Sequence, residues 1–189
     1  MENFWDYSVR VYATHDVSNH CLQLQDSFGF DVNLILFCCW HASTRAELDP
    51  VVLHRACELS AIWSKELVKP MRRARRWMKA PASQLVLPPS EQIQEQWQQL
   101  RQQIKKVELQ AEMLQENMLE SLVSSQGRDI SLEEASYCCI QNWKKLAIWC
   151  AISITEELAE VLKKLLLSVI PDTPVQQSTI KELLIAPLQ

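Results

Sequence analysis

The sequence has 189 residues, of which 48% are apolar and only two are glycine, and its formal net charge is -4. A chain of average composition would hold about 13 glycines. This shortage excludes glycine-rich dinucleotide and phosphate loops and argues against a many-turned all-β fold. The length suits one domain, so we expect a single helical domain over residues 1–170 and a loosely ordered tail over 171–189.

Capping residues and apolar periodicity predict helices from the N-terminus onward. A first helix is expected over about 4–13 and a second over about 17–28, where Gly29 follows as a typical residue after a helix end. Asp31 can cap a third helix. Its run Leu34–Trp40 is apolar on all sides, which predicts a central, buried helix.

The middle of the chain contains a proline-bounded helix and then a long amphipathic one. Asp49–Pro50 combines an N-cap with a proline at the first helical position, and a proline-containing linker is expected around Ala80–Pro89. The helix after Ser90 has apolar residues at alternating steps of four and three, which is a heptad seam. The seam residues are Ile93, Trp97, Leu100, Ile104, Val107, Ala111, Leu114 and Met118. Packing within one bundle and self-association through this 93–118 seam both remain open.

A second long helix is predicted after a turn at Ser124–Asp129. The segment Ser131–Glu134 has the form of a capping box, and apolar periodicity continues to about residue 169, where prolines follow. Two long helices joined by a short turn form an antiparallel αα-hairpin. The sequence therefore predicts an all-α fold, a single bundle of six or seven helices with a long C-terminal hairpin.

The cysteines and the apolar runs bear on the location of the protein. Seven cysteines are an odd number, and two adjacent pairs lie in apolar helical pattern, which favours reduced thiols over a disulfide framework. The acidic N-terminus lacks the apolar stretch of a signal peptide. The longest uncharged apolar run, Leu146–Thr155, is half the length of a bilayer span, so no transmembrane segment is expected. We expect a cytoplasmic protein.

All of the positive excess lies in one segment, residues 65–79, which has seven basic side chains and one acidic one. Helical spacing places five cations within an arc of about 80°, with Arg73 and Arg75 on its flanks. The five are Lys65, Lys69, Arg72, Arg76 and Lys79. Pro70 is expected to kink or restart this helix.

Two interpretations of the basic helix remain open. It can engage an anionic partner, namely nucleic acid, an acidic protein or an acidic lipid surface. Alternatively, it faces solvent or pairs with acidic residues of this chain. The acidic candidates are Glu108, Glu112, Glu116 and Glu120.

Two further clusters are weaker candidates for chemistry. Cys38 and His41, with His54 and Cys57, have spacings that could form a tetrahedral zinc site if their helices were neighbours in register, but buried thiols and hydrogen-bonded histidines are the simpler interpretation. We therefore assign no metal and no cofactor. Cys38 or Cys39 with His41 is the only local pairing of a nucleophile with a base, and a thiol deep in an apolar run has a raised pKa, so no catalytic residue is assigned.

The polar cluster Asp26, Asp31 and Asn33 surrounds Gly29. Asp31 is explained as a helix cap, whereas Asp26 falls in the last turn of a helix, where a carboxylate opposes the helix dipole. Asp26 is therefore expected to have a cationic partner such as Arg55 or an arginine of the basic helix.

Three stretches of the sequence carry a resemblance to a known family. They are Phe4-Trp5-x-x-Ser8-x-x-x-Tyr12, Cys21-Leu-x-Leu-Gln25-Asp26-x-x-Gly29-x-Asp31-Val-Asn33-Leu-x-Leu-Phe37-x-x-Trp40, and Pro70-Met-Arg72-x-x-Arg75-Arg76-x-x-Lys79. Over roughly residues 4–150, and most specifically over 4–40, the chain resembles a proteobacterial family of small conserved hypothetical proteins, a domain of unknown function. The resemblance implies a bacterial, cytoplasmic, all-helical protein and supplies no activity, cofactor or partner.

These observations lead to two functional hypotheses. The first is a non-catalytic interaction module that engages an anionic partner through the basic helix 65–79. The second is an enzyme or small-ligand binder with a polar pocket around Asp26, Asn33 and Arg72, which would require those residues to meet in the fold.

Overall fold

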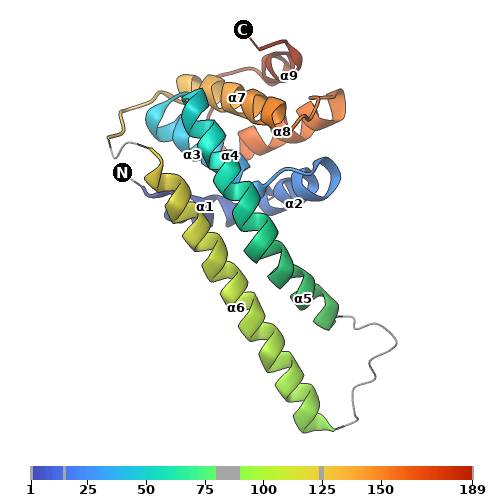
Figure 1. The fold of residues 1–189 in the computed structure, drawn as a ribbon. Helices are drawn as coiled ribbons and strands as arrows, with labels where there is room; N and C mark the ends of the chain where they lie inside the picture. Colours follow the sequence, from blue (N-terminus) through green and yellow to red (C-terminus); the bar gives the residue numbers. More distant parts are fainter. Residues whose placement is uncertain (1, 15, 80–89, 124–125, 189) are drawn as a thin grey trace. The chain divides into compact units, whose positions relative to one another are not determined.

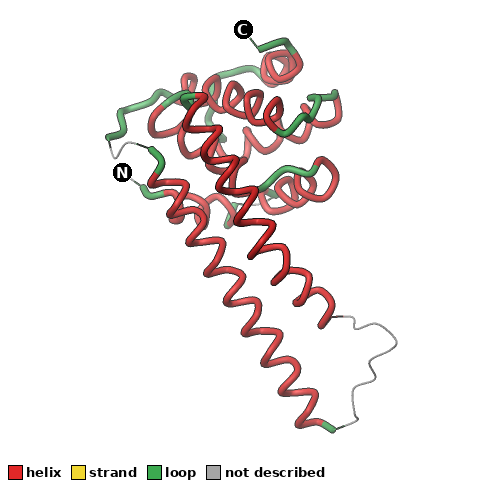
Figure 2. Tube along the Cα trace, in the orientation of Figure 1, coloured by secondary structure: helices red, strands yellow, loops and turns green. Residues whose placement is uncertain are grey.

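The computed structural model describes residues 2–14, 16–79, 90–123 and 126–188 (Figure 1). Regular structure in these ranges is entirely helical, which confirms the predicted fold class (Figure 2). The helices are α1 Phe4–Tyr12, α2 Val17–Phe28, α3 Val32–Arg45, α4 Pro50–Trp63, α5 Lys69–Lys79, α6 Glu91–Ser121, α7 Leu132–Trp149, α8 Glu156–Val169 and α9 Gln177–Ile185, with a π-helical turn η1, Ser64–Val68, between α4 and α5. The linker expected at Ala80–Pro89 lies outside the described residues.

The length suggested one domain, whereas the structure groups the chain into two compact units. The first unit combines Met1–Glu58 with Glu116–Gln189. The second unit is Leu59–Gln115, which comprises the end of α4, η1, α5 and most of α6.

In the first unit, α3 is the central helix, as its sequence predicted. Every residue from Leu34 to Ala42 is buried, and α3 packs along α7. The indole Nε1 of Trp143 donates to the carbonyl oxygen of Ile35 at 3.2 Å, and the thiols of Cys39 and Cys139 are 3.5 Å apart. The adjacent cysteine pairs thus serve as small core residues in a closely packed helix contact.

The last long helix predicted for this unit is divided into α7 and α8. At the end of α7, Ala151 has a φ of 54°, and two bonds of a Schellman motif follow: Ile152 N to Ala147 O at 2.8 Å and Ala151 N to Ile148 O at 3.0 Å. Thr155 then caps α8 by accepting from the backbone N–H of Leu158. An alanine therefore occupies the left-handed position that glycine usually marks.

The segment beyond residue 170 contains α9, where the sequence suggested a loosely ordered tail. Ile180 and Leu184 are at most 1% exposed, and α9 packs against α7 and α8. Two buried apolar side chains, Ile180 and Leu184, thus dock this short helix on the unit.

In the second unit, α6 runs antiparallel to the α4–η1–α5 run. Trp63 Nε1 donates to the carbonyl oxygen of Ala111, and Trp97 Nε1 donates to that of Met78, each at 3.0 Å. The long hairpin is therefore formed here and not, as predicted, between the helix after Ser90 and the C-terminal helix. The pairing was missed because the proline-containing linker obscured the proximity of α5 and α6.

Candidate functional site: the cationic face of α5

The basic segment forms a helix that continues through Pro70. Proline lacks a backbone N–H and its ring clashes with the carbonyl group four residues earlier. The turn before it is π-helical, and Lys69 N bonds Ser64 O across five residues. Such a turn is a known local adjustment where the regular bond pattern is interrupted. The expected kink or restart is thus a π-helical turn followed directly by α5.

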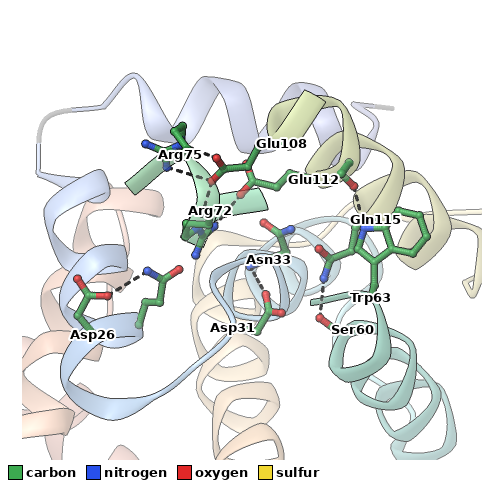
Figure 3. Close-up of polar contacts among 12 residues, drawn as sticks. Asp26, Asp31, Asn33, Ser60, Trp63, Arg72, Arg75, Glu108, Glu112 and Gln115 are labelled. Atoms are coloured by element: carbon green, nitrogen blue, oxygen red, sulfur yellow. Dashed lines mark hydrogen bonds and ion pairs between the residues drawn. The ribbon is translucent and has the colours of Figure 1, made fainter. Parts of the chain in front are cut away.

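Two arginines of α5 bind carboxylates of α6 (Figure 3). Arg72 donates through Nε to Glu108 Oε1 at 3.1 Å and through Nη2 to Glu112 Oε1 at 2.7 Å. Arg75 donates through Nε to Glu108 Oε2 at 2.5 Å and through Nη2 to Glu108 Oε1 at 3.1 Å. The bidentate Arg75–Glu108 pair is the strong form of an ion pair, and it fixes the rotation of α5 against α6.

Burial makes this cluster more than a surface ion pair. Only 7% of the Glu108 side chain is exposed, while Arg72 and Arg75 are about a quarter exposed. Burial raises the pKa of Glu108, but hydrogen bonds from Arg75 and Arg72 outweigh it and hold that pKa below its ordinary value. The carboxylate is therefore ionised and compensated by two cations, as buried charges require.

Three other cations of α5 face away from this cluster. Lys69, Arg73 and Arg76 are exposed, and within the described ranges none of their side chains has an ion pair or a hydrogen bond to another residue. They follow one another at steps of four and three, which places them within about 60° on one face. We call these three residues the outer cations.

The ends of the basic segment add two exposed lysines. Lys65 lies 3.0 Å from Glu66 in an exposed pair, and Lys79 closes α5. An exposed pair of this kind contributes little energy, so Lys65 can exchange its partner easily. The seven predicted cations thus divide into two that bind Glu108 and Glu112 and five that are exposed.

The second unit is strongly basic as a whole. It has ten Lys and Arg residues and five Asp and Glu residues, which gives a net charge of +5. Because the net charge of the whole chain is -4, the remaining residues have a net charge of -9. Even after internal pairing of Arg72 and Arg75, the unit keeps a surplus of positive charge. Such asymmetry within one chain concentrates positive electrostatic potential on the second unit.

The polar cluster around Gly29 lies in the first unit, whereas Arg72 belongs to the second. Asp31 caps α3 by accepting from Asn33 N at 2.9 Å. Asp26 is exposed, and its partner among the described residues is the side-chain amide of Gln25, at 3.1 Å, where a cationic partner was expected (Figure 3). Exposure to water explains the difference, because a solvated carboxylate at a helix end needs no counterion.

The four residues considered for zinc have other roles. The Nδ1 of His41 lies 2.9 Å from the carbonyl oxygen of Ala46, and His54 accepts from Trp149 Nε1 at 3.2 Å. Burial raises the pKa of Cys57 to about 12 and also raises the pKa of Cys38. Within the described ranges, no three His, Cys, Asp or Glu side chains are grouped so that they could hold a metal ion.

One feature escaped the sequence reasoning altogether. A cavity of about 450 Å³ lies beside the end of α7 and is lined mainly by apolar side chains such as Ile152, Ile154 and Leu184. Lys144 also lines it, is 5% exposed and donates to the carbonyl oxygen of Pro187 at 3.1 Å. Burial lowers the pKa of this lysine. The sequence signal for this cavity was Lys144, a lysine within an apolar helical pattern.

The fold and the site define an all-helical protein with a basic helical hairpin that carries an exposed cationic face. The chain belongs to the family described as protein of unknown function DUF2390, whose model matches residues 3–119. The matched region includes α5 and both of its carboxylate partners, and it ends before α7 rather than at about residue 150.

Other comparisons add no relative. No curated protein and no solved structure matches the chain. In the part of the chain that the structure describes, every helix is too short or too polar to cross a membrane.

Proposed function

We propose that this protein is a non-catalytic binding module whose α5 engages the phosphate backbone of a nucleic acid. The observation that carries the proposal is that the cations of α5 fall into two groups with different contacts. Arg72 and Arg75 fix the helix on α6, while the outer cations Lys69, Arg73 and Arg76 form an exposed row. A row of cations on a helix that is already folded can bind a polyanion without the entropic cost of ordering the backbone.

The spacing of the row suits a repeating anion. Successive outer cations are about 6 Å and 4.5 Å apart along the helix axis, given the rise of an α-helix. Two of the three are arginines, whose guanidinium groups bind phosphate in a bidentate manner. The positive charge of the whole second unit adds long-range attraction.

A lipid surface fits less well, because α5 has no apolar face available for insertion. Met78 is 5% exposed and Met71 is partly buried, so neither side chain is free to insert. A helix that binds in a membrane interface must bury its apolar face in the acyl boundary. Trp77 is 45% exposed, but its ring lies 5.6 Å from that of Trp97.

The alternative of a ligand pocket around Asp26, Asn33 and Arg72 gains no support from the contacts of these residues. The guanidinium of Arg72 is held by Glu108 and Glu112, so it offers little to a further ligand. We therefore place the function in the outer cations and assign no catalytic residue.

The test compares two double variants with the same charge change. Arg73→Gln/Arg76→Gln removes two outer cations, and Lys105→Gln/Lys106→Gln removes two exposed lysines of α6. Fluorescence anisotropy of labelled single- and double-stranded oligonucleotides at 25 mM salt would measure affinity. We expect at least a tenfold loss for the first variant and a smaller loss for the second.

Three results would overturn the proposal. They are absence of binding by the unmodified chain at low salt, equal losses for both variants, and cosedimentation with acidic lipid vesicles in the absence of any oligonucleotide binding. Competition by polyglutamate at the same charge concentration as the oligonucleotide would instead identify an acidic protein as the partner class.

A further inference from the structure

Only part of the heptad seam of α6 packs within the hairpin. Trp97, Ala111 and the polar residues Glu108 and Gln115 contact α4 or α5 directly. Glu108, Ala111 and Gln115 are at most 6% exposed. The hairpin thus uses the positions of Trp97 and Ala111 together with the adjacent polar positions.

The other half of the seam is exposed. Its members recur every seven residues and are 38% to 50% exposed: Ile93, Leu100, Val107 and Leu114. We call these four residues the outer stripe. They extend over about 30 Å of helix axis. Four large apolar side chains in one line on a helix are a typical protein interaction surface.

The partner of the outer stripe needs the same spacing. A second helix packs along such a line when its own apolar residues recur every seven residues over a similar length. Another copy of α6 supplies that pattern with the same four residues, and a twofold axis makes such a contact self-complementary.

Charge also favours a second copy. The positions three residues after Ile93, Leu100 and Val107 are Gln96, Gln103 and Gln110, all neutral amides. At the flank of a helix pair, charged residues select partners and like charges repel. A neutral flank offers no charge that an acidic or basic partner could pair with, and it places no like charges opposite one another where two identical copies meet.

We propose that two copies of this chain associate through the outer stripes of their α6 helices. Each copy contributes its α5–α6 hairpin, so the contact is a four-helix arrangement in which the outer stripe and the side of α6 that packs on α5 are neighbouring faces of the same helix. The outer stripe of one copy packs on that of the other, with the glutamine rows alongside. This dimer does not depend on nucleic-acid binding, because the outer cations take no part in it.

The test is the molar mass of the full chain in solution, followed by sedimentation velocity over 1 to 100 μM. The unmodified chain should be a dimer. The double variant Leu100→Gln/Val107→Gln should be a monomer in that range, with a loss of about a hundredfold in dimer affinity. Leu109→Gln is the matched control, since Leu109 lies on α6, is 53% exposed and is outside the outer stripe. It should leave the dimer intact.

A second pair of variants tests the neutral flank without altering the apolar residues. Gln103→Glu/Gln110→Glu should weaken the dimer at low salt, and raised salt should restore it by screening. Circular dichroism establishes that each variant is folded. A monomeric unmodified chain at 100 μM would overturn the proposal, as would a dimer that folded Leu100→Gln/Val107→Gln retains or that Leu109→Gln dissociates equally.

Discussion

The Nε of Arg72 lies 3.1 Å from Oε1 of Glu108, a carboxylate that also accepts two hydrogen bonds from Arg75. One acidic side chain of α6 therefore holds two basic side chains of α5. Because Glu108 is only 7% exposed, its ion pairs with the two arginines contribute to the free energy of unfolding of the hairpin.

We predict that Glu108→Gln lowers the free energy of unfolding by about 1–3 kcal/mol, since it leaves two partly buried arginines without their shared counterion. Glu112→Gln should lower the free energy of unfolding less, because Glu112 is 26% exposed. Chemical denaturation monitored by circular dichroism measures both. Equal losses of unfolding free energy in the two variants would show that the burial of Glu108 does not determine the size of the loss.

The same pair predicts a dependence of stability on pH. The pKa of Glu108 in the folded chain is below its value of about 4.5 in the unfolded chain, so the unfolded state binds more protons as pH falls. The contribution of Glu108 is complete above about pH 4.5 and is lost as pH falls through the lowered pKa. The difference in stability between the unmodified chain and Glu108→Gln should therefore narrow on acidification. A constant difference between pH 7 and pH 3 would contradict this.

Gly29 and Ala151 both adopt the left-handed backbone conformation, with φ values of 77° and 54°. A Cβ at Gly29 would meet nothing within 4 Å, so Gly29→Ala costs only backbone strain, about 1 kcal/mol. Ala151→Gly relieves strain of the same kind and should stabilise the chain by about 0.5–1 kcal/mol. Calorimetric melting temperatures should shift in opposite directions. A shift in the same direction would show that the loop after α7 is not strained.

Asn142 is fully buried and bridges two segments of the first unit. Its Oδ1 accepts from Leu48 N at 2.8 Å, and its Nδ2 donates to Cys38 O at 3.2 Å. Asn142→Leu keeps the approximate size but leaves the buried N–H of Leu48 unpaired, which should cost about 2–3 kcal/mol. Asn117→Leu, at an exposed position of α6, is the control and should change stability by less than about 0.5 kcal/mol. Equal stabilities of the two variants would contradict the bridge.

The sequence contained most of the information about helix beginnings. Asn3, Asp31 and Ser131 accept the capping bonds expected of them. The end of α7 was missed because Ala151 adopts a conformation for which alanine gives no signal. Thr155 followed by Glu156 and Glu157 was the available clue, since a cap and an acidic first turn mark a new helix.

The basic face was predictable, but the direction of each cation was not. The predicted arc assumed regular helical spacing from Lys65 onward, and the π-helical turn at Ser64–Val68 changes the phase of the residues that follow it. Arg72 consequently faces Glu108, and Arg73 moves from the flank to the exposed face. Likewise, spacing alone could not show that α6 packs through Glu108 and Gln115 while half of its apolar seam stays exposed.

Salt dependence gives the most specific prediction for the outer cations. If Arg73 and Arg76 each contact a phosphate, the slope of log K against log salt concentration should fall in magnitude by about 2 for duplex DNA in Arg73→Gln/Arg76→Gln. The free energy of unfolding should stay within about 0.5 kcal/mol, because both side chains are exposed. Arg72→Gln should behave in the opposite way, with a lower stability and a nearly unchanged slope, since its charge already serves Glu108 and Glu112. A reduced slope in Arg72→Gln, with no change in Arg73→Gln/Arg76→Gln, would show that the phosphate contacts come from the inner face of α5.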